Sequence, residues 1–149
     1  MILISHRGNI FGPNESMENK PEYINSALEL GYDVEIDIWV INDLLYLGHC
    51  EPNFHVDITW LIERKKNLWI HCKNIQALFF FKTCSHIFNY FWHQSDDFAM
   101  TSFGEFWTYP GKDLTSNSIA CLPEICDFKN LEKAKGVCSD FISKYLSEH

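Results

Sequence analysis

Short apolar runs separated by polar turns recur along this chain, and most of them have the length of a β-strand. In the first half they alternate with segments whose apolar residues recur at helical spacing. Alternating strand and helix signals are typical of an α/β fold with a parallel sheet or barrel. The expected strands lie at residues 1–6, 32–40, 44–47, 68–72, 87–92, 98–101, 118–122 and 136–138.

Two helices have recognisable starts in the sequence. Pro21 suits the first turn of a helix that Gly31 is placed to end. Asn74 can cap a second helix with one apolar face. In the second half only residues 128–134 and 140–146 look helical. We therefore expect several of the later strands to be joined by loops.

Two pairs of ionisable residues have the spacing that places side chains on one face of a strand. Glu35 and Asp37 alternate with apolar neighbours, and His71 and Lys73 repeat this spacing at the end of another apolar run. Two adjacent acids need compensation, which Mg²⁺ or Ca²⁺ would supply in a buried site. A half-exposed strand whose acids face water is the competing interpretation.

Polar residues also follow two other apolar runs. His6 and Arg7 come directly after the first run, and Gly8 then lets the chain turn away. Trp92 and His93 end the run that begins near residue 87. Because active residues of barrels collect at one end of the strands, we expect these side chains to converge with the ionisable pairs.

Composition narrows the class of protein. The chain has 149 residues, 46% of them apolar, and a formal net charge of −8, which indicates one acidic domain over residues 1–149. Its 12 basic and 20 acidic residues argue against nucleic acid as a partner. No basic leader or membrane-length apolar segment is present, so we expect no transmembrane segment and a cytoplasmic location. The six cysteines contain no CxxC pair, and most are expected to be buried free thiols.

The motifs, taken in order, resemble those of the glycerophosphodiester phosphodiesterases, within the wider group of phosphatidylinositol-phospholipase-C-like phosphodiesterases. The resemblance spans most of the chain and is to a small, divergent branch. It depends on the order of the motifs and on their placement at strand ends. The motifs are His6-Arg7-Gly8, Glu18-Asn19, Glu35-Ile36-Asp37, His49, His71-Cys72-Lys73 and Gly136-Val137-Cys138-Ser139-Asp140.

The resemblance implies metal-dependent hydrolysis of a small, glycerophosphodiester-like substrate. Two histidines would share the transfer of protons to and from oxygen near neutral pH, while cationic side chains hold the phosphate. The implied catalytic residues are His6, Arg7 and His49, and the implied metal ligands are Glu35, Asp37 and His71. The expected substrate-binding residues are Lys73, Glu18, His93, Trp92, Trp107 and Tyr109.

The implied fold is a TIM-type (β/α) barrel, which usually takes about 250 residues. This chain is shorter, so we expect a contracted TIM-type barrel with several helices missing in the C-terminal half. A second copy of the chain would cover the exposed sheet, which predicts a homo-oligomer. The aromatic residues that could supply this contact are Phe80, Phe81, Phe88, Tyr90 and Phe91.

Three positions depart from the family pattern. His71 stands where a metal-binding glutamate is usual, which adds Mn²⁺ to the expected ions. Cys50 replaces the acid after the second histidine, so Glu51 is the nearest candidate in sequence to orient His49. Lys20 replaces a small hydroxyl residue. A catalytically inactive relic that binds carbohydrate or phosphate therefore stays open as the alternative function.

Overall fold

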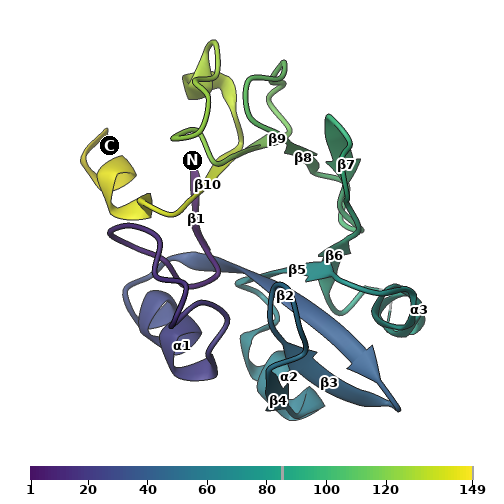
Figure 1. Cartoon of the computed structure of the whole chain (residues 1–149). Coiled ribbons are helices and arrows are strands. Elements are labelled where there is room, and N and C mark those ends of the chain that lie inside the picture. Colours follow the sequence, from purple (N-terminus) through teal and green to yellow (C-terminus); the bar gives the residue numbers. More distant parts are fainter. Residues whose placement is uncertain (85, 149) are drawn as a thin grey trace.

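Ten strands form one mixed sheet in the computed structural model, which describes residues 1–84 and 86–148. Figure 1 shows β1, β2 and β5 to β10 following one another around an arc, with β3, β4, α1, α2 and α3 outside the first part of it. The strands are β1 (Ile2–His6), β2 (Asp33–Ile41), β3 (Leu44–Leu47), β4 (Phe54–Val56), β5 (Leu68–Cys72), β6 (Asn89–Phe91), β7 (Phe98–Met100), β8 (Phe106–Thr108), β9 (Ser118–Cys121) and β10 (Gly136–Ser139). The helices are α1 (Pro21–Glu29), α2 (Ile58–Arg64) and α3 (Ile75–Thr83), with 3-10 turns η1 (Leu131–Lys133) and η2 (Ile142–Glu148).

Strand β1 joins the two halves of the sheet. It pairs in parallel with β2 on one side and with β10 on the other. Parallel pairing continues from β2 through β5 to β6, and from β10 through β9 to β8. Strands β3 and β4 extend the far end of β2 as an antiparallel meander, and β7 pairs antiparallel with β8. The carboxyl ends of the parallel strands therefore meet at one rim of a half-barrel.

The prediction of a contracted TIM-type (β/α) barrel is wrong. The sheet is mixed, and its three α-helices, counted within residues 1–84 and 86–148, all lie before Cys84. Later segments are too short or too polar for crossover helices, and the β7–β8 pair needs only a tight turn. The expected helices at 128–134 and 140–146 are short 3-10 turns, η1 and η2.

Alternation along β2 separates the two faces of the sheet. Val34, Ile36 and Ile38 pack outward in the cluster that includes the apolar residues of the helices. Glu35 and Asp37 take the opposite face, as their spacing predicts. The inner face carries a second apolar cluster of Ile4, Trp69, Phe91, Trp107, Ile119, Cys121 and Cys138. The acids thus lie beside an apolar interior.

Within the described residues, no β-pairing connects strand β6 with strand β7. Side chains and loop groups hold these two strands together instead. The amide N–H of Ser102 donates to the Tyr90 carbonyl at 2.8 Å. Glu105 Oε2 accepts from the Thr101 hydroxyl at 2.7 Å and from Asn89 at 3.2 Å, and Lys135 donates to Glu105 Oε1 at 2.7 Å. We call Asn89, Thr101, Glu105 and Lys135 the seam cluster.

Three of the five aromatic residues that could have supplied contact with a second copy pack in the core. Phe81, Phe88 and Phe91 are all buried. Their burial removes them from any contact surface.

Within the described part of the chain, none of the helices combines the length and apolar character that crossing a membrane requires.

Candidate functional site

A cavity of about 370 Å³ opens where β1, β2 and β5 reach their carboxyl ends. It gathers residues that are far apart in the sequence and that the motifs had singled out. Its lining includes His6, Arg7, Glu35, His49, His71, Lys73, Trp92, His93, Trp107 and Tyr109, together with Cys72, Gln94, Cys121 and Leu122. The predicted convergence of strand-end residues is confirmed.

The end of β1 turns sharply at the cavity. Arg7 has a φ of 56° and Gly8 a φ of 93°, both in the left-handed region. The amide of Arg7 still donates to the Glu35 carbonyl at 3.0 Å, so the turn begins only after β1 has finished pairing with β2. A Cβ at position 8 would lie 2.6 Å from the Tyr23 ring, which explains why glycine is needed there. This turn presents His6 and Arg7 side by side.

The His6 imidazole is held by Asp140, at the end of β10. Its Nδ1 lies 2.7 Å from Asp140 Oδ1, and Asn9 Nδ2 donates to the same oxygen at 2.8 Å. Glu124 in turn accepts from the Asp140 amide N–H at 2.7 Å. A carboxylate can only accept, so Nδ1 of His6 carries the proton and Nε2 keeps its lone pair. Burial would raise the pKa of Asp140, but His6 and Asn9 hold it below its usual value.

His49 is oriented by Asp37, and the expectation that Glu51 would orient it is wrong. Nδ1 of His49 lies 3.3 Å from Asp37 Oδ2, while Nε2 lies 3.4 Å from Arg7 Nη2. Because arginine only donates, Nε2 is the accepting nitrogen and Nδ1 carries the proton. Both candidate catalytic imidazoles thus use Nδ1 on a carboxylate and keep Nε2 basic. His49 is the more exposed of the two, at 42% of its side chain.

Asp37 is the most enclosed charge of the site. Its Oδ2 lies 2.9 Å from Arg7 Nε in an ion pair and accepts a hydrogen bond from Asn19 Nδ2 at 2.9 Å, and its own amide donates to Asn19 Oδ1. Burial would raise the pKa of Asp37, but the imidazoles of His49 and His71 and the Arg7 guanidinium hold it well below its usual value. Asp37 is therefore an anion at neutral pH, with one oxygen fully engaged.

Glu35 differs from Asp37 in its environment. It is 2% exposed, and burial together with the neighbouring Asp37 charge raises its pKa well above the usual value. Its Oε2 has no hydrogen-bond partner among the described residues, and neither has Asp37 Oδ1. Buried polar atoms normally have partners, so these two oxygens are available as ligand atoms for a cation, with His71 Nδ1 3.0 Å from Asp37 Oδ1.

Ligand atoms of Glu35, Asp37 and His71 all lie within 4.8 Å of one another. His71 Nδ1 is 3.0 Å from Asp37 Oδ1 and 3.7 Å from Glu35 Oε1. The connected ion-pair network of the site, seen in the described residues, contains four carboxyl groups and two permanently charged side chains, Arg7 and Lys73. A divalent cation would favour the ionised form of Glu35 beside Asp37. The three residues predicted as metal ligands thus fit one ion.

Aromatic rings form the wall opposite the charged groups. The His93 ring stacks on Tyr109 at 3.7 Å, and His71 stacks on Phe91 at 5.1 Å. Burial, with a smaller effect of His71, lowers the pKa of His93 to about 4, so this ring is neutral at physiological pH. Trp92 is 42% exposed, whereas Trp107 is 2% exposed and packs against other rings of the interior. This wall is aromatic and uncharged, and His93 Nδ1 and the Tyr109 hydroxyl are buried in it without a hydrogen-bond partner among the described residues.

Glu18 lies on the other side of Arg7 from this cavity. Its carboxylate accepts from Arg7 Nη1 at 3.2 Å and from Asn9 Nδ2 at 2.8 Å. It lines a second hollow of about 460 Å³ that shares Arg7 and His49 with the first. Glu18 therefore holds the Arg7 guanidinium in place from the side that faces away from the first cavity.

Asp140 and Asn19 are site residues to which sequence reasoning assigned no role. Both fall within motifs quoted for the family resemblance, so a signal was present in the sequence. The sequence did not show which residue each of them contacts, because the contacting residues are far apart in the chain. Asp140 lies 134 residues from His6, and Asn19 lies 18 residues from Asp37. Only the pairing of β1 with β10 and β2 brings these residues together.

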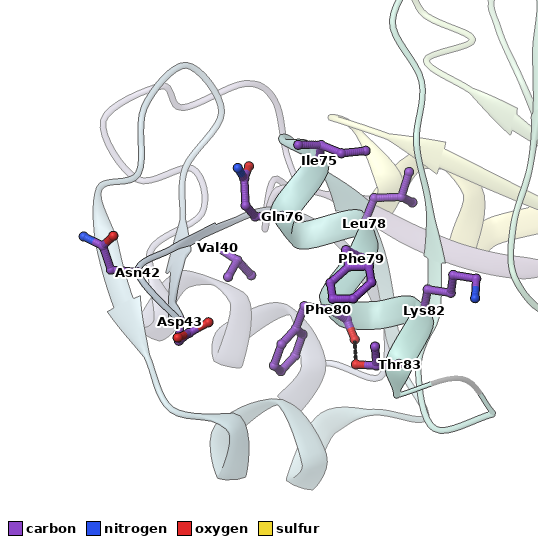
Figure 2. A pocket seen from close by; sticks show the side chains of 10 residues that line it. All are labelled: Val40, Asn42, Asp43, Ile75, Gln76, Leu78, Phe79, Phe80, Lys82 and Thr83. Atoms are coloured by element: carbon purple, nitrogen blue, oxygen red, sulfur yellow. Dashed lines mark hydrogen bonds between the residues drawn. The ribbon is translucent and has the colours of Figure 1, made fainter.

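A larger hollow lies elsewhere, a groove of about 650 Å³ between α3 and the turn after β2. Figure 2 shows its lining residues Ile75, Leu78, Phe79 and Phe80 on α3, with Asn42 and Asp43 on the turn opposite. Its charged lining residues are Asp43 and Lys82, and the histidines of the site are not part of it. The groove offers apolar surface and no grouped catalytic chemistry.

Comparisons with protein-family models, with curated proteins and with solved structures find no match to this chain. The geometry of the site is therefore the basis for the proposed function.

Proposed function

We propose that this protein is a metal-dependent phosphodiesterase that acts on a small diester, with His6 and His49 as the acid/base pair. The observation that carries the proposal is the matched state of the two imidazoles. Each has Nδ1 against a carboxylate, of Asp140 or Asp37, and each lines the same cavity. Cleavage of a phosphodiester needs one proton removed from the attacking oxygen and one given to the leaving oxygen. One imidazole would accept the first proton on an unprotonated Nε2, and the other would act as the acid after it has been protonated at Nε2.

Arg7 and Lys73 provide the positive charge for a phosphate. Arg7 is anchored through Nε on Asp37 and through Nη1 on Glu18, and Lys73 Nζ lies 3.7 Å from Asp37 Oδ1. Arg7 Nη2 has only the long contact to His49, at 3.4 Å. A phosphate oxygen would replace that contact with a shorter, charge-assisted hydrogen bond. The guanidinium is thus pre-oriented towards the cavity.

Glu35, Asp37 and His71 would hold a divalent metal ion. Such an ion, when bound, stabilises the charge that grows on the nonbridging phosphate oxygens. The clustering of ligand atoms from Glu35, Asp37 and His71, and the buried oxygens of Glu35 and Asp37 that lack hydrogen-bond partners, support this assignment. Mg²⁺, Ca²⁺ and Mn²⁺ are the ions to be tried first.

The experiment is hydrolysis of a chromogenic phosphodiester and of glycerophosphodiesters with a panel of divalent ions, with and without chelator. We expect metal-dependent turnover that falls by a hundredfold to ten-thousandfold, roughly, in His6→Ala. His55→Ala is the matched control, because His55 is exposed and packs on Tyr46 away from the cavity. Absence of turnover on every diester would remove the proposal, and faster turnover of phosphomonoesters would reassign the enzyme.

The alternative function is an inactive relic that binds carbohydrate or phosphate. In that case phosphate would bind to Arg7 and Lys73, and His6→Ala would leave its affinity unchanged. Calorimetry with inorganic phosphate, run beside the turnover assay, separates the two functions.

A further inference from the structure

We infer that the metal site selects a first-row transition ion, such as Mn²⁺, Co²⁺ or Zn²⁺, over Mg²⁺ and Ca²⁺. The inference rests on the proposed function only for the existence of a metal site. It concerns which ion the side chains accept, and it depends on the nitrogen that His71 presents to Glu35 and Asp37.

The orientation of His71 is decided by its other nitrogen. Nε2 lies 3.3 Å from the backbone carbonyl oxygen of His93, which can only accept a hydrogen bond. Nδ1 faces Asp37 Oδ1 and Glu35 Oε1, and without a metal it can donate its proton to Asp37. A metal ion held by these residues would take the place of that proton on Nδ1. Stacking on Phe91, with only 3° between the ring planes, fixes the imidazole in this position. This is the arrangement in which a metal-binding histidine donates its second N–H to a backbone carbonyl.

The spacing of the donors suits a compact ion. Nδ1 of His71 lies 3.0 Å from Asp37 Oδ1 and 3.7 Å from Glu35 Oε1. Two donors that each lie about 2.1 Å from one ion, the usual distance for zinc with nitrogen or oxygen, are separated by such distances. These two separations are therefore compatible with one shared ion of this size.

The number of oxygen donors argues against calcium. Asp37 Oδ2 is already taken by Arg7, Asn19 and His49, so Asp37 offers one oxygen only. Ca²⁺ usually takes six to eight oxygen ligands, roughly, and Mg²⁺ also prefers oxygen. Two carboxylate oxygens and one imidazole nitrogen, with room for solvent or substrate, match the three-ligand catalytic sites of transition ions.

The test measures binding without substrate. Isothermal titration of the purified, metal-free protein with MnCl₂, CoCl₂, ZnCl₂, MgCl₂ and CaCl₂ should give dissociation constants at least about tenfold lower for the transition ions. The protein carries Cys50→Ser and Cys126→Ser, because both thiols are exposed and would bind Zn²⁺ on their own. The bound Co²⁺ should show visible absorption bands that change in His71→Glu.

His71→Glu is the matched variant, because it replaces the nitrogen donor by a carboxylate. We expect it to lose affinity for Co²⁺ and Zn²⁺ and to gain affinity for Mg²⁺. Should this variant not fold, Zn²⁺ titration of ¹⁵N-histidine wild type gives the same information through a shift of the His71 Nδ1 resonance.

Equal affinity for Mg²⁺ and Mn²⁺, or an unmoved His71 Nδ1 resonance, would overturn the inference. Selective binding of transition ions without diester hydrolysis would instead leave the inference standing and remove the proposed function. The two failures are therefore distinguishable.

Discussion

Asp140 is the single residue on which the state of His6 depends most directly. Its carboxylate accepts from His6 Nδ1 at 2.7 Å and keeps the basic nitrogen, Nε2, towards the cavity. In Asp140→Asn the amide can donate to Nδ1, which favours the opposite tautomer with its proton on Nε2. We expect kcat to fall about a hundredfold or more, with KM changed little.

The comparison for this variant is Asp127→Asn, since Asp127 is exposed on the loop after β9. Steady-state kinetics on the same diester provides both parameters. A fall confined to KM would show that Asp140 binds substrate instead of orienting His6.

His93 makes the stability of the protein depend on pH. Burial lowers its pKa to about 4 in the folded protein, whereas an unfolded histidine has a pKa of about 6.5. Between these values the unfolded chain binds a proton that the folded chain does not, so stability falls as the pH falls from about 6.5 to about 4. Urea unfolding of wild type and His93→Phe across this range should show a weaker pH dependence in the variant, which keeps a ring on Tyr109. Parallel curves would contradict the assignment.

At the scale of elements, Asn74 connects helix α3 to strand β2. Its Oδ1 accepts from the Ala77 amide at 3.0 Å and from the Val40 amide at 3.2 Å, and its Nδ2 donates to the Val40 carbonyl at 2.9 Å. Asn74→Ala removes a helix cap and leaves the Val40 groups unpaired, which should lower the free energy of unfolding by about 2 kcal/mol.

Asp57→Ala is the matched control for this cap. Asp57 is the N-cap residue of α2, but its side chain makes no cap hydrogen bond. Only its interaction with the helix dipole is lost, so we expect a change within about 0.5 kcal/mol. Chemical denaturation of both variants measures the difference, and equal losses would show that the contacts of Asn74 to Val40 contribute nothing.

For the whole molecule, the seam cluster decides whether the half-barrel holds together between β6 and β7. Glu105 joins Asn89, Thr101 and Lys135 through one buried carboxylate. Burial would raise the pKa of Glu105, but Lys135 and Thr101 hold it below its usual value. Glu105→Gln should reduce the free energy of unfolding by about 2 kcal/mol, because charged hydrogen bonds in a buried cluster are lost.

An exposed ion pair provides the reference for this variant. Lys112 lies 2.9 Å from Asp97, and both side chains are about half exposed. Lys112→Gln should change stability by less than about 1 kcal/mol. Thermal unfolding of the two variants should separate them clearly. If Glu105→Gln were as stable as Lys112→Gln, the seam would have to be held by backbone contacts alone.

Features that depend on neighbours in the sequence could be predicted well. The alternation of β2 placed Glu35 and Asp37 on one face because strand geometry repeats every two residues. Asn74 was recognisable as a cap for the same reason, since a cap needs only the next three residues. Strands β4 and β8 and helix α2 were missed, because their short segments carry weak periodicity.

Local periodicity and the order of motifs are properties of the chain, so the chemical groups at the strand ends could be read from the sequence alone. How these groups are used depends on the fold. It placed Asp140 on His6, Asp37 on His49, and the His93 carbonyl on His71. The observed fold is a mixed half-barrel sheet and not the predicted barrel of alternating strands and helices. These outcomes depend on which distant strands pair, and pairing is selected by the packing of the whole interior.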